Sequence, residues 1–305
     1  MLAYVFGLIA GVFQPTQTSI NTKLTDYDRS PFVTTLLTTP TAIILMFIIV
    51  LISEGSFYLP IANIAEYPWW IWIGGLCGPV ISILSIICLP VLGSAETMML
   101  TAFGQIMAAL VIDNWGMFMS PVIRFSWQRC MGAALVIAGV AIVAGRKEAS
   151  KKGHSGGFYK VLAFIAGIAC SVQVATNGTL GKVAGSAMRA TFISMCFAMI
   201  GTVIFTLLIL TVKGREGIYT EKASSGDFKW WMATGGVAGV IIVGSNAVAA
   251  PIIGAGMVNI LNLVGEMGGG LFFDSIGFLG IEKKPVTVKK VSGVLLMIIG
   301  TILIS

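Results

Sequence analysis

One acidic residue, Glu266, lies near the middle of an otherwise apolar stretch, residues 254–274, that is long enough to span a bilayer. Asn259 and Asn262 precede it by seven and four residues, so on a helix the three side chains share one face. A carboxyl group at the centre of a transmembrane helix costs roughly 3 kcal/mol, so it usually faces a partner or a wet cavity. We expect this face to line a transport pathway in which Glu266 takes up a proton or binds a cation. The alternative is a structural glutamate hydrogen-bonded to a neighbouring helix.

Other apolar stretches also carry isolated polar side chains. Unpaired amides are costly in lipid, so we expect these groups to point into a helix bundle, where they either bind substrate or hydrogen-bond helices together. The candidate cavity residues are Asn259, Asn262, Thr101, Gln105, Gln17, Asn21, Gln173, Asn177 and Asn246. Glu96 begins an expected helix, where an acidic residue favours capping; a place in a vestibule is the alternative.

Motifs of common enzyme classes are absent from the sequence. It has neither a G-x4-G-K-[ST] phosphate loop nor a G-x-S-x-G elbow. The only histidine, His154, lies in a basic stretch without neighbours that could ligate a metal. The five cysteines fall in apolar segments without C-x-x-C spacing, which is typical of small core residues. We therefore expect a protein that is not an enzyme and has no catalytic residues, no metal and no cofactor. Its energy would come from an ion gradient or from the substrate's own gradient.

Composition places the chain in a membrane. Of its 305 residues, 56% are hydrophobic and 10% are charged, whereas soluble domains carry about 25% charged residues. The lipid bilayer is therefore an expected partner. The net charge of +6 is spread over short loops, which argues against a nucleic-acid partner. The apolar start lacks a preceding Lys or Arg and a small-residue cleavage site, so we expect a retained first helix rather than a signal peptide.

Ten apolar runs predict ten transmembrane helices, with tight helical hairpins around Gly93 and Ile252, where the connections are very short. The runs are continuous rather than alternating, which excludes a barrel, and they cover residues 2–22, 31–52, 69–90, 94–112, 127–145, 158–180, 187–211, 230–251, 253–273 and 287–304. If the loops alternate sides, 15 of the 19 Lys and Arg residues fall on one side. Because cytoplasmic loops are enriched in these residues, we predict a cytoplasmic 146–157 connection and both termini outside.

The chain repeats itself. Gly11, Gln17 and Asn21 recur as Gly167, Gln173 and Asn177 at an offset of 156, and later matches hold at an offset of 161. Five helices per repeat is an odd number, so the second repeat must enter the membrane upside down. The prediction is an all-α membrane protein of two five-helix inverted-topology repeats, residues 1–145 and 158–305, joined by a basic cytoplasmic linker, residues 146–157. The second offset pairs Gln105 with Glu266, so only one of the two walls would carry an ionisable group.

These motifs resemble the YdcZ-like family of the drug/metabolite transporter superfamily in its fused two-repeat form. The resemblance rests on the G-x5-Q-x3-N pattern in both halves and on a second repeated pattern, Gly104-Gln105…Asp113-x2-Gly116 and Gly265-Glu266…Asp274-x2-Gly277. It implies a bacterial inner-membrane transporter with ten helices. It also implies that the third and fourth helices of each half line the cavity while the fifth helices pack peripherally.

The function that the sequence favours is secondary active transport of a small organic molecule through a midplane cavity. Export of an organic cation, amphiphile or metabolite coupled to protons is the leading form of this hypothesis. The alternative is a passive channel or facilitator for a small ion or metabolite. A non-transporting membrane scaffold is a further alternative, which the short loops disfavour.

Overall fold

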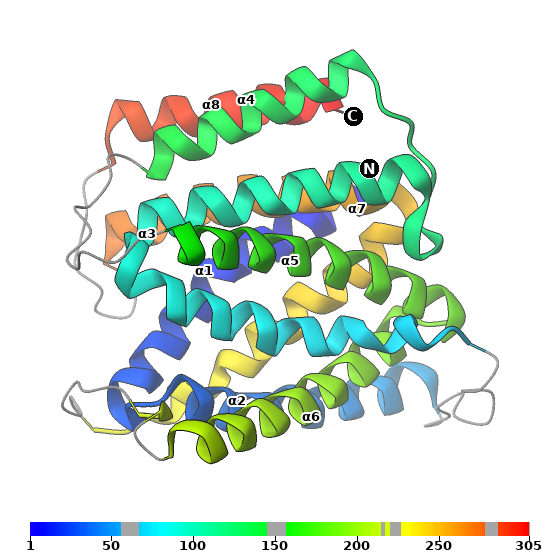
Figure 1. The fold of residues 1–305 in the computed structure, drawn as a ribbon. Coiled ribbons are helices and arrows are strands. Elements are labelled where there is room, and N and C mark those ends of the chain that lie inside the picture. Colours follow the sequence, from blue (N-terminus) through cyan, green and yellow to red (C-terminus); the bar gives the residue numbers. More distant parts are fainter. Residues whose placement is uncertain (56–66, 145–156, 215–216, 220–226, 278–285, 305) are drawn as a thin grey trace.

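The computed structural model describes residues 1–55, 67–144, 157–214, 217–219, 227–277 and 286–304, and all the regular secondary structure in these residues is helical (Figure 1). The long helices are α1 (Leu2–Asp28), α2 (Pro31–Glu54), α3 (Ile73–Trp115), α4 (Trp127–Ala144), α5 (Gly157–Val183), α6 (Ala187–Lys213), α7 (Gly235–Ile276) and α8 (Val288–Ile304). Short 3-10 turns are η2 (Trp69–Trp72), η3 (Met117–Met119) and η5 (Trp230–Thr234).

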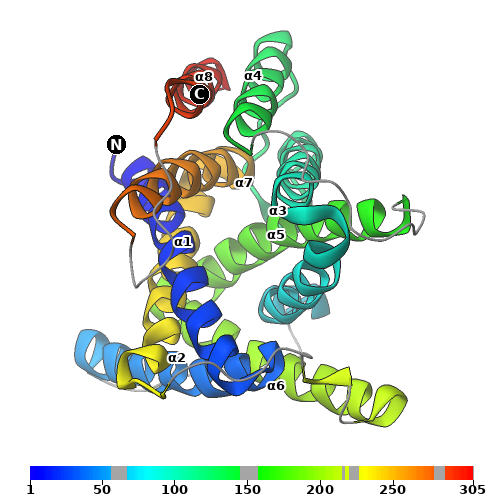
Figure 2. The same ribbon diagram turned by 90° about the vertical axis from the view of Figure 1, so that its left-hand side faces the viewer.

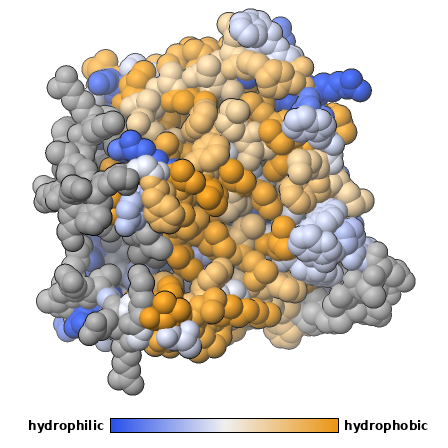
Figure 3. All heavy atoms as spheres, in the orientation of Figure 1, coloured by the Kyte–Doolittle hydropathy of each residue, from blue (hydrophilic) through white to orange (hydrophobic). Residues whose placement is uncertain are grey.

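The outside of the bundle is apolar, as a bilayer requires. Large side chains such as Ile44 and Ile52 on α2, Leu207 and Leu208 on α6, and Ile302 on α8 are exposed. Apolar atoms cover much of the face in Figure 3. A monomeric soluble protein rarely exposes so large an apolar area. The chain is therefore an all-helical membrane protein.

The expected ten segments are not ten separate helices. By length and hydropathy, six stretches of described helix are sufficient to cross a membrane: Pro31–Glu54, Glu96–Trp115, Trp127–Ala144, Gly157–Val183, Ala187–Val212 and Trp230–Phe273. The predicted segments 94–112 and 253–273 belong to α3 and α7, each of which also contains most of the segment before it. The predicted first segment ends at residue 22, whereas α1 continues to Asp28.

Helix α3 folds back on itself, as its contacts with α5 show. Its first arm contacts α5 in reverse order, and its second arm contacts α5 in the same order. The contacts are Gly74 with Asn177 and Cys88 with Tyr159 for the first arm, and Thr101 with Ala163 and Gln105 with Ser171 for the second. The reversal therefore lies between residues 88 and 101, and in Figure 1 the two arms lie on either side of α5. The hairpin expected around Gly93 falls within this interval.

Helix α7 breaks at Gly254, next to the hairpin position expected around residue 252. Gly254 has φ +81° and ψ 157°, a conformation that side chains with a Cβ rarely adopt. Asp113 caps the helical arm that begins there: its Oδ1 accepts from the Ala255 N–H at 3.1 Å and its Oδ2 from the Gly256 N–H at 3.0 Å. The Asp113 side chain is fully buried in this contact.

The three most extensive helix pairs are α1 with α7, α3 with α5, and α4 with α8, so each expected repeat packs chiefly against the other (Figure 2). Equivalent glycines lie at equivalent crossings. A Cβ on Gly11 would clash with the backbone oxygen of Asn262, and a Cβ on Gly167 would clash with that of Thr101. The two contacts are equivalent in the repeats, because Gly11 and Gly167 are related by the offset of 156 and Thr101 and Asn262 by the offset of 161. The expected linker, residues 146–157, lies outside the described residues except for Gly157, as does His154.

Candidate substrate cavity

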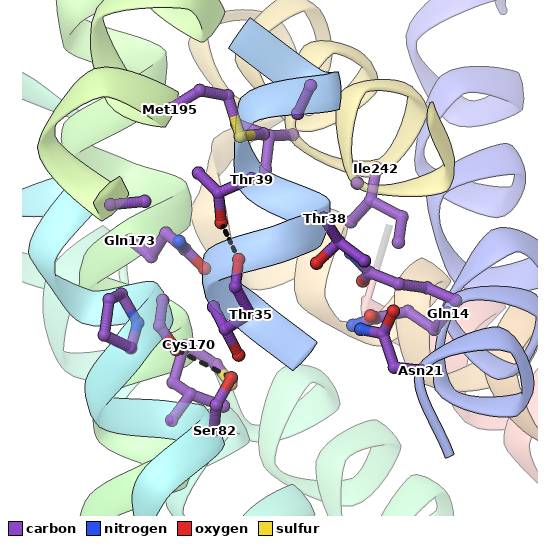
Figure 4. Close-up of a pocket in the computed structure, with 18 of the residues that line it drawn as sticks. Gln14, Asn21, Thr35, Thr38, Thr39, Ser82, Cys170, Gln173, Met195 and Ile242 are labelled. Carbon is purple, nitrogen blue, oxygen red and sulfur yellow. Dashed lines mark hydrogen bonds between the residues drawn. The ribbon is translucent and has the colours of Figure 1, made fainter. Parts of the chain in front are cut away.

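A cavity of about 350 Å³ lies between α1, α2, α3, α5, α6 and α7 (Figure 4). Most of the polar residues singled out from the sequence line it: Gln17, Asn21, Gln105, Gln173, Asn177, Asn246 and Asn262. In Figure 4, Gln173 and Ser82 lie to one side of α2, and Asn21 and Gln14 lie to the other. The structure thus brings together amides that are up to 245 positions apart in the sequence.

Helices α1 and α5 contribute equivalent faces to this wall. Lining residues of α1 stand at positions 14, 17, 18 and 21, and those of α5 stand at 170, 173, 174 and 177, which is the spacing of one helical face. Gln17 also donates a hydrogen bond from Nε2 to the Gly235 oxygen at 3.3 Å. The Oδ1 atoms of Asn21 and Asn177 occupy the space that a Cβ would need at Gly235 and Gly74. These side chains therefore form the wall and also fix helix contacts.

Asn259 lies behind the wall rather than in it. Its Oδ1 accepts a hydrogen bond from the Gln105 Nε2 at 2.9 Å, and its Nδ2 donates to the Ser171 Oγ at 2.9 Å. The Ser171 hydroxyl in turn donates to the Gln105 backbone oxygen at 2.6 Å. All three side chains are buried. This closed network holds the Gln105 amide in place at the cavity surface. Ser171 was missed in the sequence because a serine in an apolar run gives no sign of its partner.

Glu266 adjoins the cavity but is not among the residues that line it. Its surface is partly accessible, and it follows the lining residue Asn262 by one helical turn. Cys170, which does line the cavity, is close enough to Glu266 to interact with it electrostatically. The structure therefore places the carboxyl group beside the polar wall.

Two further predicted residues lie away from the cavity surface. The Thr101 hydroxyl donates to the Ala163 oxygen at 3.3 Å, which ties α3 to α5. Glu96 pairs with Lys160, with 3.0 Å between Oε1 and Nζ. This contact is an ion pair between α3 and α5. The capping and vestibule interpretations of Glu96 both stay predictions.

Hydroxyl groups of α2 form a part of the wall that was not predicted from the sequence. Thr35, Thr38 and Thr39 line the cavity, and each donates its hydroxyl hydrogen to a backbone oxygen four residues earlier. The hydroxyl oxygens keep lone pairs that can accept further hydrogen bonds. The spacing of these threonines at three and four residues in an apolar run was a usable signal.

The cavity is displaced toward the end of the bundle where α1 meets α2. Its lining on α2 covers residues 35–42, whereas the lining on the equivalent helix α6 covers 195–202, one turn later by the offset of 156. Helix α2 starts at that end of the bundle and α6 runs toward it (Figure 1). Lining residues that are earlier on α2 and later on α6 therefore both lie nearer to the end where α1 meets α2.

At the opposite end, side chains pack tightly together. The Phe118 ring lies edge-on to Trp70 with 5.5 Å between centroids, and the Thr179 hydroxyl donates to the Phe118 oxygen. Asp113 and Arg129 form a buried ion pair there, with 3.2 Å between Oδ2 and Nη2. Within the described residues, the cavity thus lies nearer to one end of the bundle, and the other end is packed.

Fold and cavity together define a polytopic helical membrane protein with an internal polar site. A model of the family described as "Putative inner membrane exporter, YdcZ" matches residues 2–142 and 158–303, and the chain belongs to this family. Among 28 solved chains that match, one crystal structure aligns over 99% of this chain and 95% of its own, with a TM-score of 0.65 and 16% identity. At that identity the likeness shows the fold alone. No curated protein matches.

Proposed function

We propose that this protein is a secondary active transporter that exports a small organic molecule across the inner membrane, with the cavity as its substrate site. The observation that carries the proposal is a cavity of about 350 Å³ lined by amides and hydroxyls inside an apolar bundle. Polar groups at membrane depth are costly unless they serve a pathway or a partner. Membership of a family of inner-membrane exporters supports this direction of transport.

The proposed topology has ten crossings, in two inverted repeats at residues 1–145 and 158–305, with the linker 146–157 in the cytoplasm. The equivalent close contacts at Gly11 and Gly167 support the internal two-fold relation. The surplus of basic loop residues supports the orientation. On the proposed outer side, Arg129 pairs with Asp113 and Arg189 pairs with Glu54, so half of its four cationic side chains are neutralised. In Figure 1 both termini lie toward the same, right-hand side of the bundle.

With this orientation the cavity faces the cytoplasm. Substrate would then enter from inside, and a rocking motion of the two repeats would expose it outside. Glu266 would couple this cycle to protons. Its protonated, neutral form and its charged form favour different surroundings, so each form would favour a different conformation of the protein. Because Glu266 lies beside the lining residue Cys170, its charge can act on the cavity although its side chain does not occupy it.

Proteoliposomes loaded with a pH-sensitive dye test this proposal. A panel of amino acids, sugars, polyols and quaternary ammonium ions is added in turn under an imposed pH gradient. We expect at least one solute to drive saturable proton movement, which Glu266→Gln abolishes and the non-cavity variant Thr301→Val retains. Proton-linked flux that persists in Glu266→Gln would refute the coupling. Flux that does not saturate with any solute would identify a passive channel, and no flux with any solute would favour a scaffold.

A further inference from the structure

We infer that the cavity selects uncharged solutes rich in hydrogen-bond donors, of the size and kind of a sugar alcohol. This inference rests on the proposed function, since it names the substrate class of the same site. Its first support is the charge of the wall. Among the described residues that line the cavity, none is acidic, basic or a histidine. An ion that leaves water for such a wall meets no counter-charge in the lining itself to offset its desolvation, and the nearby Glu266 is assigned to the proton.

The second support is a set of buried amide oxygens without a hydrogen-bond partner in the protein. The Oδ1 atoms of Asn177, Asn246 and Asn262 are unpartnered, and the three residues are only 1%, 7% and 3% exposed. All three residues line the cavity. Each of these oxygens is itself buried, so a solute that donates O–H or N–H groups reaches it only after the side chain turns toward the cavity. That turn is favoured because a buried acceptor without a partner costs about 1–3 kcal/mol. The glutamines and threonines of the wall add both donors and acceptors.

The third support is the apolar part of the wall, which is aliphatic. Met195, Ile242 and Val243 contribute to it, and no described lining residue is aromatic. Quaternary ammonium and other lipophilic cations are recognised by aromatic faces or by carboxylates. Flat aromatic solutes would lack a stacking partner. Aliphatic side chains instead suit the C–H faces of a polyhydroxylated chain.

The size of the cavity sets an upper limit. A volume of about 350 Å³ corresponds to roughly a dozen water molecules at ~30 Å³ each. It therefore accommodates one hexitol with a few waters but no large amphiphile. In this arrangement Asn246 and Asn262 hold the solute, while Glu266 beside the wall takes the proton, so recognition and coupling belong to different residues.

A series that changes charge on a constant polyol chain tests the inference. Radiolabelled sorbitol is equilibrated with the purified full-length protein, and gluconate and N-methylglucamine, its anionic and cationic analogues, compete for the site. Direct binding is preferable to thermal stabilisation, because polyols stabilise proteins by exclusion from their surface. We expect saturable sorbitol binding and competition at least about tenfold weaker by either charged analogue.

Variants separate recognition from folding and from coupling. Asn246→Leu should weaken sorbitol binding about tenfold by removing one acceptor, while Thr301→Val, a buried hydroxyl deletion outside the cavity, should leave it unchanged. Asn246→Asp should reverse the preference toward N-methylglucamine, a result that a misfolded protein cannot give. Absence of sorbitol binding, stronger competition by a charged analogue, or unchanged binding in Asn246→Leu would each overturn the inference. Sorbitol binding without transport would instead contradict only the proposed function, and Glu266→Gln should bind sorbitol normally.

Discussion

Asp113 shows how one buried carboxylate can serve two elements. It accepts hydrogen bonds from two backbone N–H groups at the start of the second arm of α7 and pairs with Arg129 of α4. Its side chain is fully buried, and that of Arg129 is only 6% exposed. The resulting network links three helices at the packed end of the bundle. A helix N-terminus favours a negative group, so the carboxylate is stabilised from both directions.

Replacement of Asp113 should therefore destabilise the fold strongly. We expect Asp113→Asn to cost roughly 3 kcal/mol, because it leaves the buried Arg129 charge without a partner. The measurement is denaturant unfolding of the purified protein in detergent. The double variant Asp113→Asn with Arg129→Leu is the control, and it should regain part of the loss. A double variant less stable than the sum of the two single changes would contradict this account.

At the residue scale, the sequence predicted which amides face inward but not what each one does. Asn259 and Asn262 share a helical face with Glu266, yet Asn262 lines the cavity while Asn259 is enclosed by Gln105 and Ser171. Periodicity fixes the direction of a side chain to within a helical face. Whether it ends at a cavity or at another helix depends on the neighbouring helix, which local sequence does not specify.

At the scale of helices, glycines set how closely the main pairs approach. Gly167 on α5 meets the Thr101 backbone oxygen on α3, and Gly11 on α1 meets that of Asn262 on α7. A backbone atom cannot rotate away as a side chain can. The distance between helix axes at these crossings thus depends on a hydrogen atom in place of a methyl group.

A methyl group at position 167 should push α5 and α3 apart where they cross. Gly167→Ala is expected to lower the free energy of unfolding by about 1–3 kcal/mol, because the added Cβ overlaps backbone. The matched control is Gly268→Ala on α7, where an added Cβ meets nothing within 4 Å and a helical alanine should be neutral or slightly stabilising. Comparison of thermal unfolding for the two variants is sufficient. Equal stability would mean that the crossing can widen without cost.

The positions of the helical segments were predictable from the sequence, whereas the end of α1 and the break in α7 were less predictable. Continuous apolar runs predicted the ends of α2, α4 and α6 to within two residues. Polar residues after position 22 concealed the last turns of α1, which remain helical to an αL cap at Arg29. The break in α7 depends on the Asp113 carboxylate, which is 141 positions away from Gly254, and no local signal reports such a partner.

For the whole molecule, the displaced cavity defines one end of the transport cycle. Ser82 is an exposed residue of the displaced cavity, whereas Val122 is exposed in the segment between α3 and α4 at the packed end. The duplicated sequence gave reason to expect a cavity between halves. It could not say which end is open, because the two repeats supply similar residues to both ends.

Cysteine labelling tests this orientation. The five native cysteines are replaced by alanine, and Ser82→Cys or Val122→Cys is added. In sealed vesicles, a membrane-impermeant maleimide should react with Ser82→Cys only from the cytoplasmic side and with Val122→Cys only from the outer side. The opposite pattern would invert the proposed topology. Labelling of Ser82→Cys from both sides would show that the cavity opens to each side in turn under resting conditions.

The crossed helix pairing has a consequence for how the protein is made. Helix α1 emerges from the ribosome first, but its main partner, α7, begins only at Gly235. Until then Gln17 and Asn21 lack the glycines of α7 that they contact in the finished protein. A nascent chain therefore carries an unsatisfied polar face in the bilayer through most of its synthesis. Arrested chains that end before residue 235 should be substrates for membrane quality-control proteases, whereas chains that include α7 should be protected.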